Sequence, residues 1–282
     1  MTSVIIPHTK DKVEYFSYSI GFMNISDKQL DNFDVIIVGG GMVGATQAQA
    51  LLKQNKRVLL VEQNLPSHDW LKSVPLRVSA INLFSEDYLK ELGVWSHIDR
   101  GHKCMFDQLG TWDNPKQKLI FSAEEIGKVH LGHLIRNEAL QLAAYDAFAD
   151  SLDNGSLMLT DASVLNIEND IEQVVVTLDK SGEKWQIVAG LVIAADGANS
   201  KVRQMAGMGI TGWDYQQHCF SITIKTEFPT QSITWQEFQP SGPKAFLPLE
   251  NGFACLIWYD HPEIVKKLKK LINQVSIHKS SP

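Results

Sequence analysis

The amino-acid sequence predicts an α/β protein in two parts, a βαβ unit of parallel strands followed by a mostly antiparallel sheet. Between residues 34 and 195, apolar runs of strand length alternate with helical patterns, as in parallel sheets buried on both faces. From residue 219 onward, apolar and polar residues alternate, which is typical of antiparallel strands with one solvated face. The 282 residues, 44% hydrophobic and 21% charged, suffice for one large domain or two ordinary ones.

Residues 34–62 carry the clearest pattern, because strand, turn, helix and strand follow one another without interruption. Apolar runs predict strands at Asp34–Val38 and Arg57–Val61. A glycine turn, Gly39–Gly44, and an Ala-rich helix, Ala45–Asn55, connect them. We therefore expect a parallel βαβ unit whose sheet is buried on both faces.

Further strands and helices are predicted up to residue 195. A helix at Arg136–Ala149 has apolar residues at helical spacing, and Leu109–Phe121 is predicted to be a hairpin. The remaining elements are a helix at Ser85–Leu92 and strands at Arg77–Ile81, Leu157–Leu165, Gln173–Leu178, Trp185–Val188 and Leu191–Ala195.

The last third of the chain predicts a separate sheet and a closing helix. Short alternating strands are expected at Phe220–Ile224, Thr234–Phe238, Ala245–Leu247 and Phe253–Tyr259. The helix Glu263–Val275 is amphipathic, and we expect its apolar stripe to pack on the sheet while its basic face is solvated. A basic helix of this kind also fits a membrane surface, which stays open as the alternative. The stripe consists of Ile264, Leu268, Leu271, Ile272 and Val275, and the basic face of Lys266, Lys267, Lys269 and Lys270.

The glycine turn fits the pattern G-x-G-x-x-G between a buried strand and a helix. Gly39 permits the tight turn, Gly41 lets the backbone approach a pyrophosphate at the helix N-terminus, and Gly44 lets helix and strand pack closely. Glu62 follows at the end of the second strand, where an acidic residue hydrogen-bonds an adenosine ribose. The sequence therefore predicts dinucleotide binding, with NAD and FAD both compatible with this unit.

A second motif follows the apolar run Leu191–Ala195. Residues Asp196–Arg203 fit the pattern D-G-x-x-S-x-x-R. By itself, an Asp-Gly turn before a surface helix explains these residues equally well. Beyond a dinucleotide turn, the pattern resembles a signature of the single-component flavin aromatic hydroxylases. In that family the acidic residue helps to hold the flavin, and the segment also serves the nicotinamide donor.

Other segments narrow the resemblance to the ubiquinone-biosynthesis branch of that family, in particular to members acting on a polyprenyl methyl-methoxy-benzoquinol. The resemblance extends from about Asp34 to Tyr259. The segments that carry it are Arg77–Ile81, Leu92–Trp95, Leu191–Ala206 and Gly242–Leu249.

The resemblance implies an FAD-dependent monooxygenase that hydroxylates a polyprenyl benzoquinol or phenol ring, with NAD(P)H as electron donor and O2 as oxygen source. NADH and NADPH, the several ring positions and any oligomeric state fit these motifs equally. No catalytic residue is assigned. The residues implied in cofactor binding are Gly39, Gly40, Gly41, Gly44, Glu62, Arg77, Arg136, Asn137, Asp196 and Gly197.

The fold implied by the resemblance is a Rossmann-like FAD-binding βαβ domain with an antiparallel-sheet substrate domain. We expect residues 1–33 to be a poorly ordered extension, because they offer no periodic apolar face. The other predicted boundaries are 34–106 with 128–218 for the FAD-binding domain, 107–127 with 219–262 for substrate-domain strands, and 263–282 for the terminal helix and tail.

One departure from the family bears on activity. The family carries a later Gly-Asp segment that binds the ribityl chain and pyrophosphate of FAD, whereas no Gly-Asp pair occurs in this sequence. We therefore expect the C-terminal part of the family fold to be missing and FAD to bind more weakly than in a full-length relative. The alternative function is a non-catalytic remnant that binds nucleotide or docks on a biosynthetic complex.

Composition and spacing argue against several other functions. A net charge of −6 opposes nucleic-acid binding, and no apolar run is long enough to cross a bilayer. Cys104, Cys219 and Cys255 lack metal spacing, so we expect small core residues and no metal site. We expect a cytoplasmic protein, with peripheral contact at the inner membrane face as an open alternative.

An NAD-dependent dehydrogenase would need an acid–base pair that no residue spacing reveals. His130, His133, His218 and His261 are four candidates, and nothing in their spacing singles one out as a general base. The D-G-x-x-S-x-x-R motif also opposes this interpretation.

Overall fold

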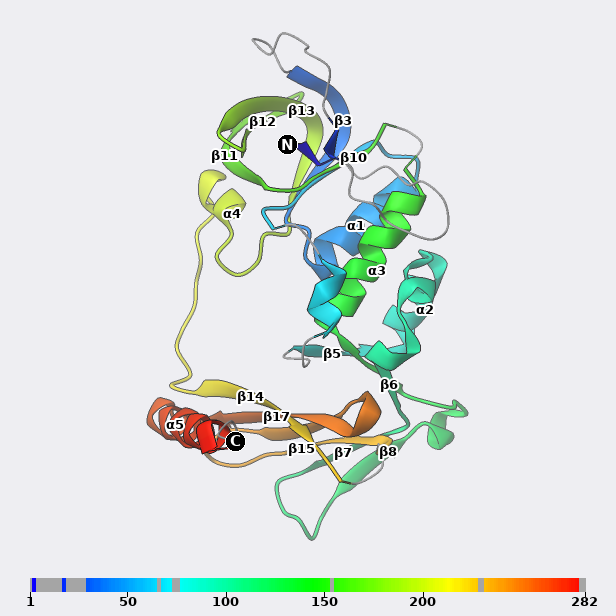
Figure 1. Ribbon diagram of the computed structural model, residues 1–282, viewed down its shortest axis with the longest axis vertical. Helices are drawn as coiled ribbons and strands as arrows, with labels where there is room; N and C mark the ends of the chain where they lie inside the picture. Colours follow the sequence, from blue (N-terminus) through cyan, green and yellow to red (C-terminus); the bar gives the residue numbers. More distant parts are fainter. Residues whose placement is uncertain are drawn as a thin grey trace. The chain divides into compact units, whose positions relative to one another are not determined.

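The computed structural model (Figure 1) describes residues 2–3, 17–18, 29–64, 67–72, 77–152, 155–227 and 231–278, with side chains between Phe33 and Leu271. Contacts between residues divide the chain into two compact units, which are described separately. Unit 1 comprises Met1–Lys72, Asp87–Ile98 and Glu138–Ile210, and unit 2 comprises Ser73–Glu86, Asp99–Asn137 and Thr211–Pro282.

A six-stranded sheet in the order β10-β4-β3-β13-β12-β11 forms the centre of unit 1 (Figure 1). The first four strands in this order are parallel to their neighbours, and the last two are antiparallel. The elements are β3 (Gln29–Val38), α1 (Met42–Leu52), β4 (Val58–Val61), α3 (Asn137–Asp150), β10 (Leu157–Leu159), β11 (Ala162–Asn169), β12 (Val174–Lys180), β13 (Glu183–Ala194) and α4 (Lys201–Met205).

The predicted βαβ unit is confirmed, since α1 connects two neighbouring parallel strands, β3 and β4. Ile36, Ile37 and Leu59 are fully buried, as expected for a sheet covered on both faces. The helix begins three residues earlier than predicted, at Met42, because Gly41 serves as its N-cap. Helix α3 is buried on nearly all sides, which explains its Ala-rich sequence.

Two strand predictions were wrong in detail. The segment Leu157–Leu165 is two strands, because Asp161 adopts a left-handed conformation with φ +54° that ends β10. Conversely, β13 is one strand where two were predicted, at Trp185–Val188 and Leu191–Ala195. It pairs with β12 in its first half and with β3 along most of its length. One strand therefore joins the parallel and antiparallel parts of the sheet.

Unit 2 contains a second six-stranded sheet, in the order β14-β17-β16-β15-β7-β8. All its pairs are antiparallel except β15 with β7, so the prediction of a largely antiparallel sheet separate from β3 is confirmed. Its strands are β7 (Gln108–Trp112), β8 (Leu119–Ser122), β14 (His218–Lys225), β15 (Ile233–Glu237), β16 (Lys244–Pro248) and β17 (Phe253–Asp260).

A three-stranded antiparallel sheet, β5-β9-β6, also belongs to unit 2. Cys104, Phe106 and Leu134 of this sheet form one buried cluster with Leu249 and Cys255. The strands are β5 (Val78–Asn82), β6 (Lys103–Phe106) and β9 (Gly132–Arg136), and α2 (Leu83–Glu91) follows β5 directly. In the two units together, short 3-10 turns lie at His68–Lys72, Val94–His97, Arg100–His102, Glu124–Ile126 and Glu250–Gly252.

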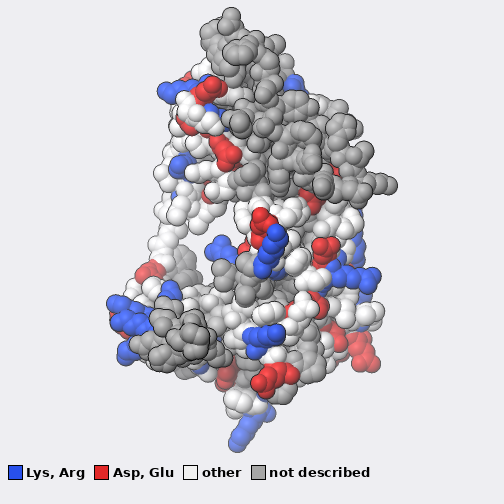
Figure 2. All heavy atoms as spheres, in the orientation of Figure 1, with Lys and Arg blue, Asp and Glu red and all other residues white. Residues whose placement is uncertain are grey.

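The closing helix α5 (Pro262–His278) contacts β14 and β17, but not through the whole predicted stripe. Val265 is 1% exposed, whereas Ile264 and Leu271 are 39% and 57% exposed. The helix therefore packs on the sheet through the side that carries Val265, and part of its apolar surface stays exposed. Its four lysines are exposed, and Figure 2 shows Lys and Arg side chains over the region of α5, while the side chain of Ile272 lies outside the described residues.

The cysteine prediction holds for two of three residues. Cys104 and Cys255 are buried, and burial together with Glu250 raises the pKa of Cys104 to about 12, so this thiol stays protonated. Cys219 on β14 is exposed, which corrects its assignment as a core residue. Among the described residues, no helix combines the length and apolarity needed to cross a bilayer.

The predicted N-terminal extension, residues 1–33, lies mostly outside the described residues. Within it, β1 (Thr2–Ser3) pairs antiparallel with β2 (Ser17–Tyr18), and β3 begins at Gln29 rather than at Asp34. The poor order expected of the extension stays a prediction. So do the functional domain boundaries, although the contact-based units group 73–86, 99–106, 128–137 and 211–218 with the antiparallel sheet rather than with the nucleotide unit.

Candidate nucleotide-binding site

The turn between β3 and α1 leaves no room for side chains at two glycines. Gly39 has φ +100°, and a Cβ there would lie 2.4 Å from the backbone oxygen of Ala195. A Cβ on Gly44 would lie 1.9 Å from the oxygen of Gly39. The Gly39 N–H also donates to the Val61 oxygen at 2.8 Å. Both glycines are therefore needed for the chain to turn tightly between strand and helix.

Gly41 differs, because a Cβ built on it would have no atom within 4 Å. It is the N-cap of α1, and no side chain caps this end of the helix. The first turn of α1 also contains no acidic residue. Uncapped N–H groups and the positive end of the helix dipole form a cradle for an anion, so this turn fits the pyrophosphate of a dinucleotide.

Glu62 lies at the end of β4, beside the same turn. One carboxylate oxygen accepts the Gly40 N–H at 2.6 Å, and the other accepts the Asn64 N–H at 2.8 Å. Its own N–H donates to the Leu159 oxygen of β10 at 2.8 Å. A carboxylate can accept about four hydrogen bonds, so Glu62 keeps capacity for ribose hydroxyls while its position is fixed.

Two residues that hold the turn were missed by sequence reasoning. Gln141 and Tyr145 of α3 donate to the Gly40 oxygen at 2.8 Å and 2.6 Å. A Cβ on Gly40 would lie 1.9 Å from the Tyr145 hydroxyl, so this glycine is required by packing against α3. Their spacing of four residues on one helix face was the available signal, but the partner is 101 and 105 residues away.

In the segment after β13, hydrogen bonds at the start of α4 account for much of the D-G-x-x-S-x-x-R pattern. Asp196 Oδ2 accepts the N–H groups of Lys201 and Val202 at 2.7 Å and 3.2 Å, at the start of α4. Ser200 caps the same helix by accepting the Arg203 N–H at 2.9 Å. The Ala195 N–H donates to the Val38 oxygen at 2.7 Å, which brings this segment beside the glycine turn.

We predict that Asp196→Ala lowers the free energy of unfolding by about 1 kcal/mol at pH 7, the usual effect of losing a helix-capping side chain. Burial alone would raise the pKa of Asp196. Hydrogen bonds from Ser200 and the backbone together lower it by more, so the net shift of the pKa is downward. Its stabilising contribution is therefore present above the ordinary value of 3.8 and is lost as pH falls through the lowered pKa.

Urea denaturation of both proteins at neutral and acidic pH checks this prediction, and the difference between them should shrink on the acidic side. Glu125→Ala removes an exposed carboxylate and serves as the control. An equal loss for both variants, or a difference that does not change with pH, would contradict the capping role.

The three other predicted site residues belong to unit 2. Arg77 is exposed just before β5, and its backbone oxygen accepts the Asn137 N–H at 3.1 Å. The Asn137 side chain accepts the Ser79 hydroxyl at 2.8 Å. Arg136 is 6% exposed. The structure thus groups Arg77, Arg136 and Asn137 with one another, and separately groups the glycines, Glu62 and Asp196; their roles stay predictions.

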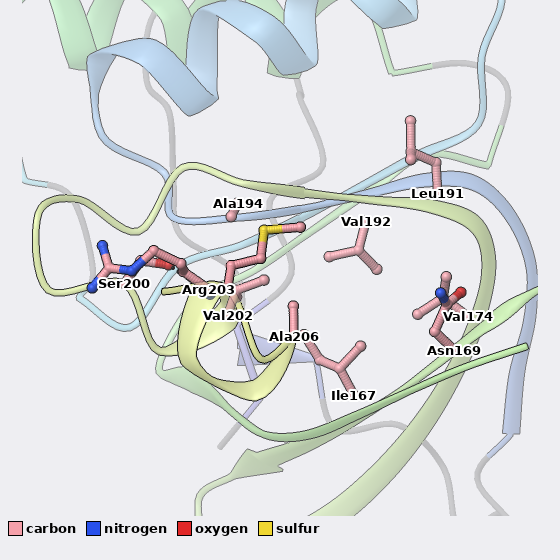
Figure 3. Close-up of a pocket in the computed structure, with 11 residues that line it drawn as sticks. Ile167, Asn169, Val174, Leu191, Val192, Ala194, Ser200, Val202, Arg203 and Ala206 are labelled. Carbon is pink, nitrogen blue, oxygen red and sulfur yellow. Dashed lines mark hydrogen bonds between the residues drawn. The ribbon is translucent and has the colours of Figure 1, made fainter. Parts of the chain in front are cut away.

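A pocket of about 530 Å³ lies in unit 1 beside α4 (Figure 3). Aliphatic side chains from β11, β13 and α4 line it, among them Ile167, Val192 and Val202, with Arg203 also contributing. The described residues that line it include none of the predicted cofactor-binding residues. The predicted nucleotide cradle at Gly41 is therefore separate from this pocket.

Comparison with known proteins identifies the family of this chain. A family model described as "FAD binding domain" matches residues 32–263. The 3-demethoxyubiquinol 3-hydroxylase of Escherichia coli (strain K12) is 37% identical over 240 residues, which cover 84% of this chain and 60% of that protein. The mitochondrial ubiquinone biosynthesis monooxygenase COQ6 of Rattus norvegicus is 31% identical over 242 residues, covering 80% and 50%. The chain thus spans between half and three fifths of the length of these relatives.

Solved structures share the fold at low sequence identity. The p-nitrophenol 4-monooxygenase PnpA of Pseudomonas putida DLL-E4 superposes with a TM-score of 0.70 at 18% identity, covering 84% of this chain and 61% of that one. The flavin-dependent monooxygenase PieE, solved with FAD and substrate, gives a TM-score of 0.64 at 16% identity, covering 83% and 43%.

Proposed function

Because the chain belongs to the FAD binding domain family, we propose that it binds FAD at the turn between β3 and α1 and acts as an FAD-dependent monooxygenase. The observation that carries the proposal is the cradle at Gly41, which combines open space with an uncapped helix N-terminus. Glu62 stands beside it as an acceptor for ribose hydroxyls. The names of the relatives point to ubiquinone biosynthesis.

In this proposal the residues of the chain bind and orient the cofactor. The N–H groups at the start of α1 hold the pyrophosphate, and Glu62 hydrogen-bonds the adenosine ribose. Gln141 and Tyr145 keep the turn in shape through the Gly40 oxygen. Asp196 and Gly197, together with Arg77, Arg136 and Asn137, are proposed as further cofactor contacts.

When bound and reduced by NAD(P)H, FAD supplies the chemistry that inserts one atom of O2 into a ring C–H bond and releases the other as water. The proposed substrate is a polyprenyl quinol or phenol. Unit 2 is proposed to receive it, because its sheet carries adjacent aromatic side chains. Trp112 and Trp235 lie 5.2 Å apart between ring centroids, and Trp235 and Phe246 are stacked at 5.7 Å.

A second proposal is nucleotide binding without turnover, either alone or on a biosynthetic complex. It rests on the same cradle at Gly41, which offers binding contacts and has no assigned catalytic residue beside it. Both proposals share the site at Gly41 and differ only in whether product forms. The proposed location is cytoplasmic, with peripheral membrane contact as the route to a lipid-soluble substrate.

One experiment separates the proposals. The chain is incubated with FAD, NAD(P)H, a short-chain prenyl quinol and ¹⁸O2, and the product is examined by mass spectrometry. The monooxygenase proposal predicts one ¹⁸O atom in the ring and one NAD(P)H oxidised for each product molecule. FAD binding without labelled product would support the second proposal. Failure to bind FAD would contradict both.

A further inference from the structure

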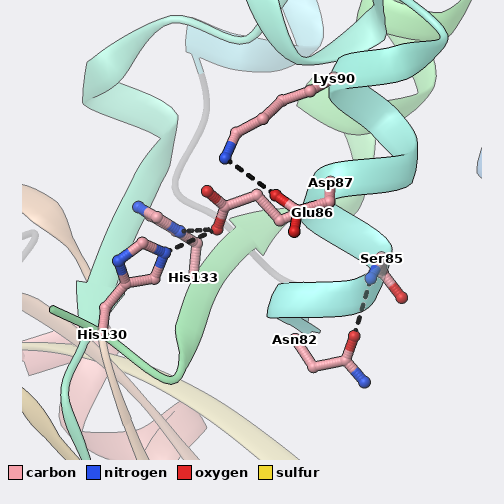
Figure 4. Close-up of polar contacts among 7 residues, drawn as sticks. All are labelled: Asn82, Ser85, Glu86, Asp87, Lys90, His130 and His133. Atoms are coloured by element: carbon pink, nitrogen blue, oxygen red, sulfur yellow. Dashed lines mark hydrogen bonds and ion pairs between the residues drawn. The ribbon is translucent and has the colours of Figure 1, made fainter. Parts of the chain in front are cut away.

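In unit 2, the side chain of Glu86 meets two histidines that lie more than 40 residues further along the chain (Figure 4). Glu86 Oε2 lies 2.9 Å from His130 Nε2 and 2.9 Å from His133 Nδ1. The two imidazole rings are 4.7 Å apart between centroids and meet edge to face at 71°. Both ring nitrogens therefore contact the same carboxylate oxygen, and the three possible ligand atoms lie within 4.8 Å of one another.

The protein framework holds these groups in place. Glu86 lies on α2 with its side chain 3% exposed. His133 lies on β9 between Ile81 of β5 and Met105 of β6, so both neighbouring strands fix its backbone. His130 precedes β9, and the next residue, Leu131, donates its N–H to Phe106 at 2.9 Å. The positions of the three ligand atoms thus follow from packed secondary structure.

The spacing is close to that of a metal centre. Imidazole and carboxylate ligands bound to Zn²⁺ at about 2.0–2.1 Å in a tetrahedron are separated by about 3.3 Å. A shift of a few tenths of an ångström from the observed 2.9 Å would admit an ion between Glu86 and each histidine. The side chains of His130 and His133 are 21% and 14% exposed, which leaves a path for an ion and for water.

We propose that Glu86, His130 and His133 form a binding site for a divalent transition-metal ion, with Zn²⁺ as the best-matched ion. Two imidazoles and one carboxylate are a donor set that suits Zn²⁺, and a water completes the fourth position. The ion ties α2 to β9 and takes no part in the cofactor site at Gly41. This proposal does not depend on the proposed monooxygenase function.

The sequence predicted no metal site because its ligands show no recognisable pattern. His130 and His133 are three residues apart, but Glu86 precedes them by 44 and 47 residues. Only folding brings the Glu86 carboxylate to the two imidazoles. The competing explanation is a cluster in which Glu86 simply accepts hydrogen bonds from two neutral histidines, and the following experiment decides between them.

The full chain is stripped with a chelator and titrated with Zn²⁺ in competition with a chromophoric chelator, and then with Co²⁺, whose visible absorption reports four-coordinate binding. We expect one ion per chain. Glu86→Gln and His130→Asn should each weaken Zn²⁺ binding by about 100-fold or more, since even changes outside the ligand set typically cost 10–100-fold. The control is His218→Asn, which alters an exposed histidine of β14 and should bind as the wild type does.

The proposal is overturned if the wild type binds no Zn²⁺, or if both ligand variants bind as tightly as the His218 variant. Circular dichroism checks that each variant is folded. If Glu86→Gln unfolds the chain, His130→Asn decides the outcome, because His130 is partly exposed and precedes the strand.

Discussion

Gly44→Ala should destabilise the nucleotide unit by about 3 kcal/mol, the upper range for forcing extra atoms into a packed region. The added Cβ would lie 1.9 Å from the Gly39 oxygen and 3.0 Å from the Ala195 side chain. The nearest obstacle is backbone, so the strand and the helix must move apart to admit a methyl group. Urea denaturation followed by circular dichroism measures the loss.

Gly41→Ala is the matched control, with the same chemical change three residues earlier. A Cβ there meets no atom within 4 Å, and its φ of −59° suits any residue. Stability should change by less than about 1 kcal/mol, the scale of an N-cap substitution. The methyl group would occupy the cradle, so FAD affinity should fall at least about tenfold, or about 1.4 kcal/mol.

The pair thus separates a glycine required for packing from a glycine required for binding. Equal losses of stability in the two variants would contradict the geometry of the turn. An unchanged FAD affinity in Gly41→Ala would contradict its role as the pyrophosphate cradle.

Phe148→Ala should cost about 3–5 kcal/mol of unfolding free energy, as for other large aromatic side chains removed from a core. Phe148 is 0% exposed on α3, among the largest fully buried side chains of the described residues. Its loss leaves a cavity in the unit that carries the glycine turn. Because Gln141 and Tyr145 of the same helix hold Gly40, FAD binding should weaken together with stability.

Phe84→Ala tests the same substitution on α2, where the ring is 83% exposed. Its unfolding free energy should stay within about 0.5 kcal/mol of the wild type, as for most surface substitutions. Thermal or urea denaturation compares the two variants directly. A small effect at Phe148 would show that α3 does not form the core described, and a large effect at Phe84 would contradict the exposure of that ring.

The βαβ unit was predictable from sequence because its signals are local. The apolar runs around Ile36 and Leu60 and the glycine turn between them each depend on a few neighbouring residues. The division of β13 was mispredicted because this strand has different partners at its two ends. A strand's partners are set by the whole sheet and not by its own residues.

The residues of the candidate site also fall into those predictable from local sequence and those that only the fold brings together. The motif at Gly39–Gly44 and the acidic position at Glu62 follow a fixed spacing, so the sequence alone was enough to predict them as binding residues. The support from Gln141 and Tyr145 depends on the orientation of α3, which no short pattern encodes. The group of Glu86 with two histidines was missed for the same reason, because α2 and β9 meet only in the folded unit.

Calorimetric titration of the full chain with FAD, followed by competition with ADP, tests the central claim most directly. The account predicts saturable binding of one FAD per chain. It also predicts displacement by ADP, which carries the pyrophosphate and ribose that the α1 N-terminus and Glu62 are proposed to hold. No saturable FAD binding, or FAD binding that ADP does not weaken, would contradict the proposed nucleotide site.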